Sequence, residues 1–316
     1  VLHFKFFASF SDYARQEAHR EVHAMAGEQY KTYHGKLSEN DRLTLYDPEH
    51  SVRFEGARQL HELEILSAET IVPAPYFPPI PARPSSAEPP PFWSVMVTVY
   101  DRPQNVERVL ESVLSQADEP MQIAVVCDHS DPQTQQRIAA ETHRVGQGRV
   151  EFLPETTRVG HPHIFNRCIE LARGDWVHIL HDDDWVEPGY YRALRAGIEA
   201  EPAAGAAFCQ HSIVDHGPGG PTTRQSWSER ETPGLVADWL ERIAVECRVQ
   251  FSAMAVRRDV YAAVGGFCPD ALSAFDWEMW ARIAARYPVY YVPEALVGVG
   301  RDDTAESSRL TRLGEQ

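Results

Sequence analysis

Cysteine, basic residues and long apolar runs are all scarce in this chain of 316 residues, and each scarcity excludes a class of protein. The five cysteines are odd in number, scattered and never arranged as Cys-x-x-Cys. The sequence therefore predicts neither a disulfide framework nor a structural zinc site. Reduced cysteines in apolar surroundings are typical of cytoplasmic proteins, and we expect that location.

The chain carries 30 Lys and Arg residues against 46 Asp and Glu residues, which gives a net charge of −16. A surface of that sign repels phosphate backbones and anionic lipids, so we expect no binding to nucleic acid or to a membrane surface. No apolar run approaches the roughly 20 residues that a membrane-spanning helix needs. The opening VLHFKFFASF is too short, and too soon followed by charges, to predict a signal peptide.

The sequence does contain enough apolar material for a sizeable core, because 43% of its residues are hydrophobic. Nine of the nineteen residues from 73 to 91 are proline, which predicts an extended linker. Polar, helix-prone residues come before this linker, and we expect an N-terminal helical appendage over residues 1–72. One large domain is expected over 92–300, followed by a C-terminal tail over 301–316.

After the linker, apolar strands alternate with amphipathic helices. This alternation predicts an α/β fold with a Rossmann-like, mostly parallel sheet and helices on both faces. A Gly- and Pro-rich stretch at 217–234 interrupts the pattern and predicts a flexible loop. The expected strands lie at 94–100, 122–128, 150–154, 175–184 and 206–215, and the expected helices at 103–114, 131–145, 161–172 and 275–284.

Acidic residues follow several of these strands, at the sheet edge where open α/β folds bind their ligands. Asp101 and Asp128 each come after a strand, and three adjacent carboxylates, 182–184, come after another. Close carboxylates repel one another by up to ~4 kcal/mol per pair at an effective dielectric near 20, so we expect a compensating cation. Oxygen ligands favour Mg²⁺ or Mn²⁺. The alternative is a solvated acidic turn before the helix that Pro188 begins.

Two other carboxylates each allow a structural and a functional interpretation. Asp128 is either a turn or capping residue ahead of Pro132, or an acceptor for the N–H groups of a nucleotide base. Asp276 lies near the start of the helix at 275–284, where a carboxylate is favourable in any case. Its aromatic neighbours could also raise its pKa, which suits a general base.

Taken in order, these segments resemble the family 2 inverting glycosyltransferases of the GT-A fold, over about residues 92–300. Six segments match motifs of that family at similar spacing. The six are Thr98–Arg102 (a Thr-Tyr-Asn-Arg-like turn), Val126–Ser130 (Val-Asp-Asp-Gly-Ser), Gly160–Asn166 (Gly-x-x-x-x-Arg-Asn), Leu180–Asp184 (Leu-Asp-x-Asp-Asp), Val264–Phe267 (Gly-Gly-Phe) and Phe275–Trp280 (Glu-Asp-x-Asp-Leu-Trp).

The resemblance implies a role for the matched residues. Asp276 becomes the candidate catalytic base. Asp183 becomes the candidate metal ligand, with Asp184 as a second candidate, and the implied cofactor is Mn²⁺ or Mg²⁺. The residues implied in binding the donor nucleotide are Thr98, Tyr100, Arg102, Asp128, Arg158, Asn166 and Asp182, and those implied beside the donor sugar or acceptor are Gly265, Gly266, Trp277 and Glu278.

Three residues depart from the family pattern. Cys127 replaces the first acid of the base-binding turn, and His181 stands where the family often has the first acid of its metal motif. Phe165 replaces an arginine that would face the diphosphate, so another arginine must supply that charge. The candidates are Arg102, Arg158 and Arg301.

The function implied by this resemblance is transfer of a sugar from a nucleoside-diphosphate sugar, with a UDP-sugar as first choice, to an acceptor hydroxyl with inversion. The acceptor is expected to be a glycan, a natural product or a peptide, and the appendage offers a route to a homodimer. A nucleotidyltransferase is an alternative, but it would show a Gly-rich basic loop after the first strand. A non-catalytic protein that binds sugar nucleotides is the other alternative.

Overall fold

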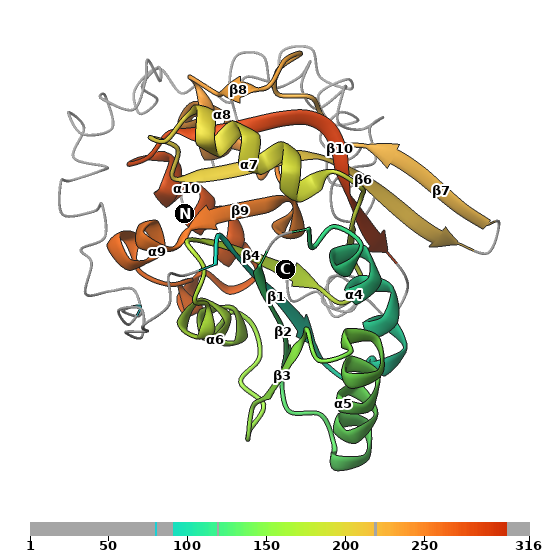
Figure 1. Cartoon of the computed structure of the whole chain (residues 1–316). Coiled ribbons are helices and arrows are strands. Elements are labelled where there is room, and N and C mark those ends of the chain that lie inside the picture. The colour runs from blue at the N-terminus through green and yellow to red at the C-terminus, as the bar shows by residue number, and fades with distance from the viewer. Residues whose placement is uncertain (1–79, 81–90, 119, 218–219, 302–316) are drawn as a thin grey trace, which may run out of the picture. The chain divides into compact units, whose positions relative to one another are not determined.

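The computed structural model describes residues 80, 91–118, 120–217 and 220–301, which include nearly all of the expected large domain. The expected appendage, nearly all of the proline-rich linker and the tail after Arg301 lie outside the described residues. The described strands form one mixed ten-stranded sheet with helices against both faces (Figure 1). The predicted α/β class is therefore confirmed.

Four parallel strands form one half of this sheet, in the order β3-β2-β1-β4. The nearly continuous apolar sequences of β1, β2 and β4 fit strands that are covered on both faces, and every residue of β1 is buried. The chain adds β2 and β3 on one side of β1 and then returns to add β4 on the other side. Right-handed crossovers therefore put the helices after β1 and β2 on one face of the sheet and the helix after β3 on the other. The strands are β1 (Trp93–Val99), β2 (Met121–Cys127), β3 (Glu151–Pro154) and β4 (Trp176–His181).

The crossover helices begin where the sequence predicts. Pro103 starts a short 3-10 turn, η3 (Pro103–Asn105), that leads into the first helix, and Asp131 caps the second by accepting hydrogen bonds from two backbone N–H groups. Figure 1 shows α4 and α5 together on one side of β1–β3, and α6 on the other side. The helices are α4 (Val106–Leu114), α5 (Pro132–Gly146) and α6 (His163–Leu171).

The other half of the sheet mixes strand directions. The short strand β9 runs antiparallel between β4 and β6, and β10 pairs in parallel with β6 through two register shifts. Three small strands, β5, β7 and β8, pair antiparallel with β10 or β6. Their bounds are β5 (Trp185–Val186), β6 (Ala206–Gly217), β7 (Gly220–Gln225), β8 (Gly234–Leu235), β9 (Met254–Arg257) and β10 (Val289–Arg301).

Strand β7 corrects the expectation of a flexible loop over 217–234. Residues 220–225 pair with β6, and the resulting two-stranded ribbon extends away from the rest of the sheet (Figure 1). Gly220 and Pro221 are the first two residues of β7, and Gly234 begins β8. The rest of β7, Thr222 to Gln225, has the side chains that a paired edge strand tolerates.

The remaining helices complete the domain. Helix α10 packs against α8, and α7 lies along β10 and β6. Their bounds are α7 (Tyr190–Ala200), α8 (Trp239–Val245), α9 (Arg258–Val264) and α10 (Phe275–Ala284), with 3-10 turns η4 (Phe251–Ala253) and η5 (Pro269–Ala274). Among the described helices, none is both long and apolar enough to cross a membrane.

All five cysteines are free thiols. Four of them, Cys127, Cys168, Cys209 and Cys268, are buried as the sequence predicts. Cys247 differs, because it lies exposed in the segment that follows α8.

Candidate active site

The loops at the carboxyl ends of β1 and β2 are joined to each other. Asp101 and His129, which follow these strands, both adopt a left-handed backbone conformation, with φ of 53° and 41°. The backbone N–H of Asp101 donates to Ser130 Oγ at 3.0 Å and so links the two turns. Left-handed non-glycine residues cost free energy and tend to occur at functional sites. Two of them therefore mark this edge of the sheet.

The predicted acidic triplet follows β4, on the neighbouring strand, and its three carboxylates have different surroundings. Asp182 is buried, and this desolvation raises its pKa to about 7, against the opposing charge of Arg102. Asp184 is also buried and accepts hydrogen bonds from Ser252 Oγ and from the backbone N–H of Gly300. Burial, together with the charge of Asp183, raises the pKa of Asp184 well above its usual range.

Asp183 is the most exposed of the three, with 19% of its side chain accessible. Its Oδ2 atom accepts a hydrogen bond from Arg102 Nη1 at 2.8 Å, and the same nitrogen lies 3.4 Å from Asp182 Oδ1. Arg108 donates to the backbone carbonyl of Asp183 at 2.7 Å. A Cβ atom at Gly300 would lie 2.4 Å from that carbonyl oxygen, so only glycine lets β10 approach the acidic turn so closely.

The residues around Asp183 fit a divalent cation. Ligand atoms of His181, Asp183 and Asp184 lie within 4.8 Å of one another. His181 Nε2 and Asp182 Oδ2 are buried and have no hydrogen-bond partner within the described part of the chain. Desolvation lowers the pKa of His181 to about 4, so its imidazole is neutral and able to act as a ligand. Carboxylate oxygens together with one neutral imidazole are a donor set that divalent cations accept.

An aromatic cluster lies beside His181. The imidazole ring of His181 stacks on Phe251 and on Phe165, with ring centroids 4.8 and 5.4 Å apart. Phe165, which takes the place of the arginine expected from the family pattern, is completely buried in this cluster. An arginine at position 165 would bury its charge among aromatic rings without a partner, which is unfavourable. This cost is a physical reason for phenylalanine in place of the arginine.

The aromatic cluster also brings α10 to this edge of the sheet. Phe275, the first residue of α10, packs against Phe165 at 5.4 Å and against His161 at 6.0 Å, and both of these rings also stack on His181. Asp276 is next in the chain and is partly buried. Desolvation raises its pKa to about 6, although the backbone N–H of Trp277 donates to its Oδ1 at 2.7 Å. A carboxylate with that pKa suits a general base.

Asp128 lies at the end of β2 and holds the loop before α6. Its two carboxylate oxygens accept hydrogen bonds from the backbone N–H groups of Val159 and Gly160, at 2.7 and 2.9 Å. In the same loop, the Arg158 guanidinium lies 4.1 Å from the ring centroid of Tyr100. Tyr100, Asp128 and Arg158 therefore lie close together, while Thr98 is buried within β1 opposite His181 of β4.

Asn166 ties α6 to the predicted Gly-Gly-Phe turn. Its amide donates to the carbonyl of Phe267 at 3.0 Å and accepts from the N–H of the same residue at 2.7 Å. A Cβ atom at Gly266 would lie 2.4 Å from Asn166 Oδ1, so the close contact requires glycine. The side chain of Asn166 is thus engaged with protein backbone, and its predicted contact with a nucleotide stays a prediction.

Glu278 binds Arg282 one turn along α10, with two hydrogen bonds of 2.8 and 2.7 Å. Arg282 in turn donates to the carbonyls of Val264, Gly265 and Gly266 at 2.7 to 3.2 Å. Trp277, by contrast, points toward α8, where its indole N–H donates to the carbonyl of Ile243. Glu278 and Arg282 therefore support the turn that contains Gly265 and Gly266, whereas Trp277 contacts α8.

Ser252, Arg108 and Arg282 each hold a site residue in place and were not predicted from the sequence. Only the last had a readable signal, because Glu278 and Arg282 are spaced as an i,i+4 helix pair. Ser252 and Arg108 contact the acidic turn across 68 and 75 residues of sequence, and no local pattern indicates such contacts.

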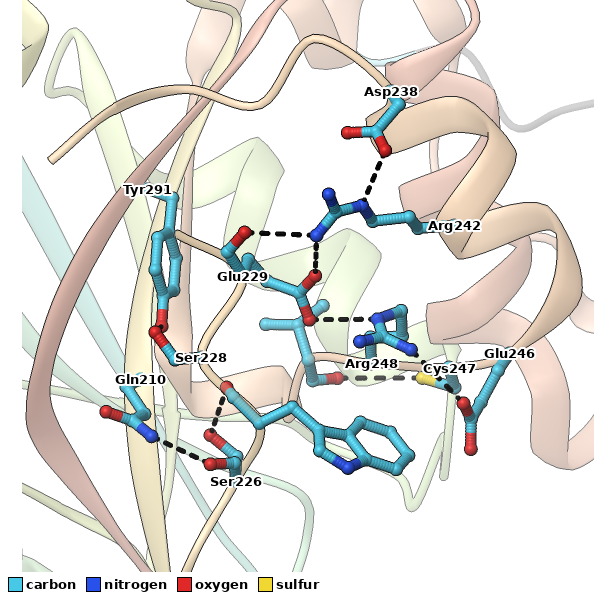
Figure 2. Close-up of polar contacts among 12 residues, drawn as sticks. Gln210, Ser226, Ser228, Glu229, Asp238, Arg242, Glu246, Cys247, Arg248 and Tyr291 are labelled. Atoms are coloured by element: carbon cyan, nitrogen blue, oxygen red, sulfur yellow. Dashed lines mark hydrogen bonds and ion pairs between the residues drawn. The ribbon is translucent and has the colours of Figure 1, made fainter. Parts of the chain in front are cut away.

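A second polar cluster, which we call the Glu229 clamp, consists of Glu229, Arg242 and Arg248 (Figure 2). The Glu229 side chain is 1% exposed and accepts from both arginines at 2.8 Å. Arg242 also binds Asp238 at 2.9 Å, and the Arg248 guanidinium lies 4.6 Å from the ring of Trp227. The clamp fixes the segment after β7 onto α8 and onto the segment after it.

The described geometry agrees with comparisons to known proteins. The model of glycosyl transferase family 2 matches residues 94–264, which is more than half of the chain. An uncharacterized protein of Mycobacterium tuberculosis is 29% identical over 229 residues, which cover 70% of each chain.

Two solved structures share the fold at low sequence identity. S. aureus TarS in complex with UDP-GlcNAc has a TM-score of 0.53 and 19% identity, over 68% of this chain and 60% of that one. A mannosyltransferase of Pyrobaculum calidifontis in complex with GDP-Man and Mn²⁺ has a TM-score of 0.52 and 19% identity, over 74% of this chain and 62% of that one. The chain thus spans less than two thirds of each solved protein. The family match confirms the resemblance seen in the sequence, and the chain belongs to glycosyl transferase family 2, with the GT-A fold.

Proposed function

We propose that this protein is an inverting glycosyltransferase that moves a sugar from a nucleoside-diphosphate sugar to an acceptor hydroxyl. The observation that carries this proposal is the arrangement around the carboxyl end of β4. Asp183, the acidic residue most open to solvent, lies there beside Arg102. The first turn of α10, which holds Asp276, reaches the same edge through the aromatic cluster around His181.

The donor is proposed to be a UDP-sugar, bound with its base near Tyr100 and Asp128. The solved TarS structure holds UDP-GlcNAc, and the solved mannosyltransferase holds GDP-Man. Asp128 already accepts two backbone N–H groups, and each of its oxygens has a second lone pair for a base N–H. Thr98, Arg158, Asn166 and Asp182 complete the proposed nucleotide site, with Asp182 near the ribose.

Asp183, with His181 and Asp184 beside it, would hold Mn²⁺ or Mg²⁺ together with the diphosphate. A bound divalent cation supplies Lewis-acid stabilisation of the charge that develops on the leaving diphosphate. Asp184 is tied to Ser252 and Gly300, so its first role here is to fix the turn that presents Asp183.

Asp276 is the proposed base of a single displacement. Its carboxylate takes the proton of the acceptor hydroxyl while that oxygen forms a bond to the anomeric carbon. The bond from this carbon to the diphosphate oxygen breaks, and its electron pair leaves with the nucleoside diphosphate. Attack from the face opposite the leaving group inverts the anomeric centre, and Gly265, Gly266, Trp277 and Glu278 would shape the sugar and acceptor side.

The test is release of nucleoside diphosphate from UDP-, dTDP- and GDP-sugars in the presence of Mn²⁺, with candidate glycan, natural-product and peptide acceptors. We expect one donor to be consumed, and Asp276→Asn to lower turnover by about 10²–10⁴-fold while donor binding persists. Donor binding without any turnover would instead favour a non-catalytic sugar-nucleotide-binding protein. Near-normal turnover in the Asn variant would remove Asp276 from its proposed role.

A further inference from the structure

Arg102 is already bound to the Asp183 carboxylate, which the proposed divalent cation would also use. Its Nη1 lies 2.8 Å from Asp183 Oδ2 and 3.4 Å from Asp182 Oδ1, and its side chain is 23% exposed. A guanidinium group is permanently charged and matches the geometry of carboxylates, so Arg102 partly offsets the charge of the two aspartates without a metal. The third carboxylate, Asp184, is stabilised separately by Ser252 and Gly300.

A divalent ion on Asp183 would compete with this contact. Mg²⁺ coordinates carboxylate oxygens at about 2.0–2.1 Å and requires a regular geometry. An ion on either oxygen of Asp183 would therefore lie close to the guanidinium that binds Oδ2. Two cations at that spacing repel each other strongly unless an anion lies between them. A diphosphate is such an anion, and it binds arginine through paired hydrogen bonds.

We propose that Arg102 is an exchangeable counter-ion, which pairs with Asp183 in the free protein and moves to the diphosphate when donor and metal bind together. This inference rests on the proposed function. Removal of Arg102 should raise the metal affinity of the nucleotide-free protein, which metal binding through the diphosphate alone does not predict. Nucleotide binding draws Arg102 away from Asp183, so it also raises metal affinity. By linkage, the metal then raises nucleotide affinity by the same factor.

Arg108 provides a matched control for this exchange. It is also an arginine beside Asp183, but it donates to the backbone carbonyl at 2.7 Å and stacks over Trp185 at 4.7 Å from the ring centroid. Its contact is to a neutral oxygen that a metal on the carboxylate does not need. Removing Arg108 therefore changes the local charge by the same amount without freeing the Asp183 carboxylate.

The experiment measures Mn²⁺ affinity by electron paramagnetic resonance of the free ion, with and without UDP, in the wild type, Arg102→Gln and Arg108→Gln. We expect Arg102→Gln to bind Mn²⁺ without UDP about 10-fold more tightly than the wild type, within the 5–150-fold range typical of coupled sites. We also expect UDP to enhance Mn²⁺ binding in the wild type and far less in Arg102→Gln. Arg108→Gln should show a smaller change and keep the enhancement.

Unchanged or weaker Mn²⁺ binding in Arg102→Gln would overturn the exchange. The proposed function would survive that result if the wild type still bound Mn²⁺ with UDP. No Mn²⁺ binding to the wild type, with or without UDP, would contradict both the exchange and the proposed metal site.

Arg102→Lys guards against misfolding of the glutamine variant: it keeps the charge but cannot bridge two carboxylates with a planar fork. It should shift Mn²⁺ affinity in the same direction by a smaller factor, and a shift in the opposite direction would also count against the exchange.

Discussion

Three neighbouring aspartates, 182–184, have separate tasks in this protein because their surroundings differ. Asp184 is buried and bonded to Ser252 and Gly300, and Asp182 is buried with its pKa raised to about 7. Asp183 alone points outward, beside Arg102. Burial and hydrogen bonding thus leave Asp183 as the most accessible of the three carboxylates.

Asp276 is the residue whose ionisation should be visible in the enzyme's rate. Its pKa is raised to about 6 by desolvation, and a general base works only when deprotonated. We therefore expect kcat/KM to rise as the pH increases through about 6 and to level off above it. A pH–rate profile that is flat between about pH 5 and 7 would contradict this assignment.

The same desolvation of the ionised Asp276 carboxylate should lower the free energy of unfolding. Its pKa rises from 3.8 to about 6 on folding, so ionised Asp276 destabilises the folded state at neutral pH, and the effect disappears as the pH falls toward 4. Asp276→Asn should raise the free energy of unfolding by up to about 3 kcal/mol at pH 8. Urea unfolding at several pH values measures this, and a gap that widens on acidification would be the opposite of what we expect.

At the scale of elements, the contact between α6 and the turn after α9 requires glycine at position 266. Gly266→Ala would place Cβ 2.4 Å from Asn166 Oδ1, and such overpacking typically costs about 1–3 kcal/mol. The double variant Asn166→Ala/Gly266→Ala removes the clash, so its loss of stability should be less than the sum of the two single losses. Additive losses, measured by urea unfolding, would mean that the two elements are not coupled in this way.

The Glu229 clamp links the segment after β7, helix α8 and the segment after α8, and no local sequence pattern predicts these contacts (Figure 2). Breaking a buried ion pair costs about 3–5 kcal/mol, and the two arginines here are 33% and 22% exposed, so we expect roughly 2–3 kcal/mol for Glu229→Gln. Glu241→Gln, on the exposed side of α8, is the control and should stay within about 0.5 kcal/mol of the wild type. Equal losses for both variants would show that the clamp adds nothing specific.

At the scale of the whole molecule, the parallel half of the sheet could be predicted because each of its strands is marked by a short, continuous sequence pattern. The apolar runs of β1, β2 and β4 and the acids that follow them are contiguous in the sequence. The partners of those acids could not be predicted, since Arg102 and Asp183 are 81 residues apart. Strand β7 was missed for the same reason: its pairing with β6, and not its Gly- and Pro-rich start, decides its conformation.

This edge of the sheet is proposed to bind a sugar nucleotide together with a divalent ion. The most direct measurement is a thermal-shift panel of UDP-, dTDP- and GDP-sugars with and without Mn²⁺, since a ligand that binds the native state raises its Tm. We predict that one nucleotide class, UDP first, raises the Tm with Mn²⁺ and much less without it, and that Asp183→Ala loses this response. No shift with any nucleotide, or an equal shift in Asp183→Ala, would contradict the account.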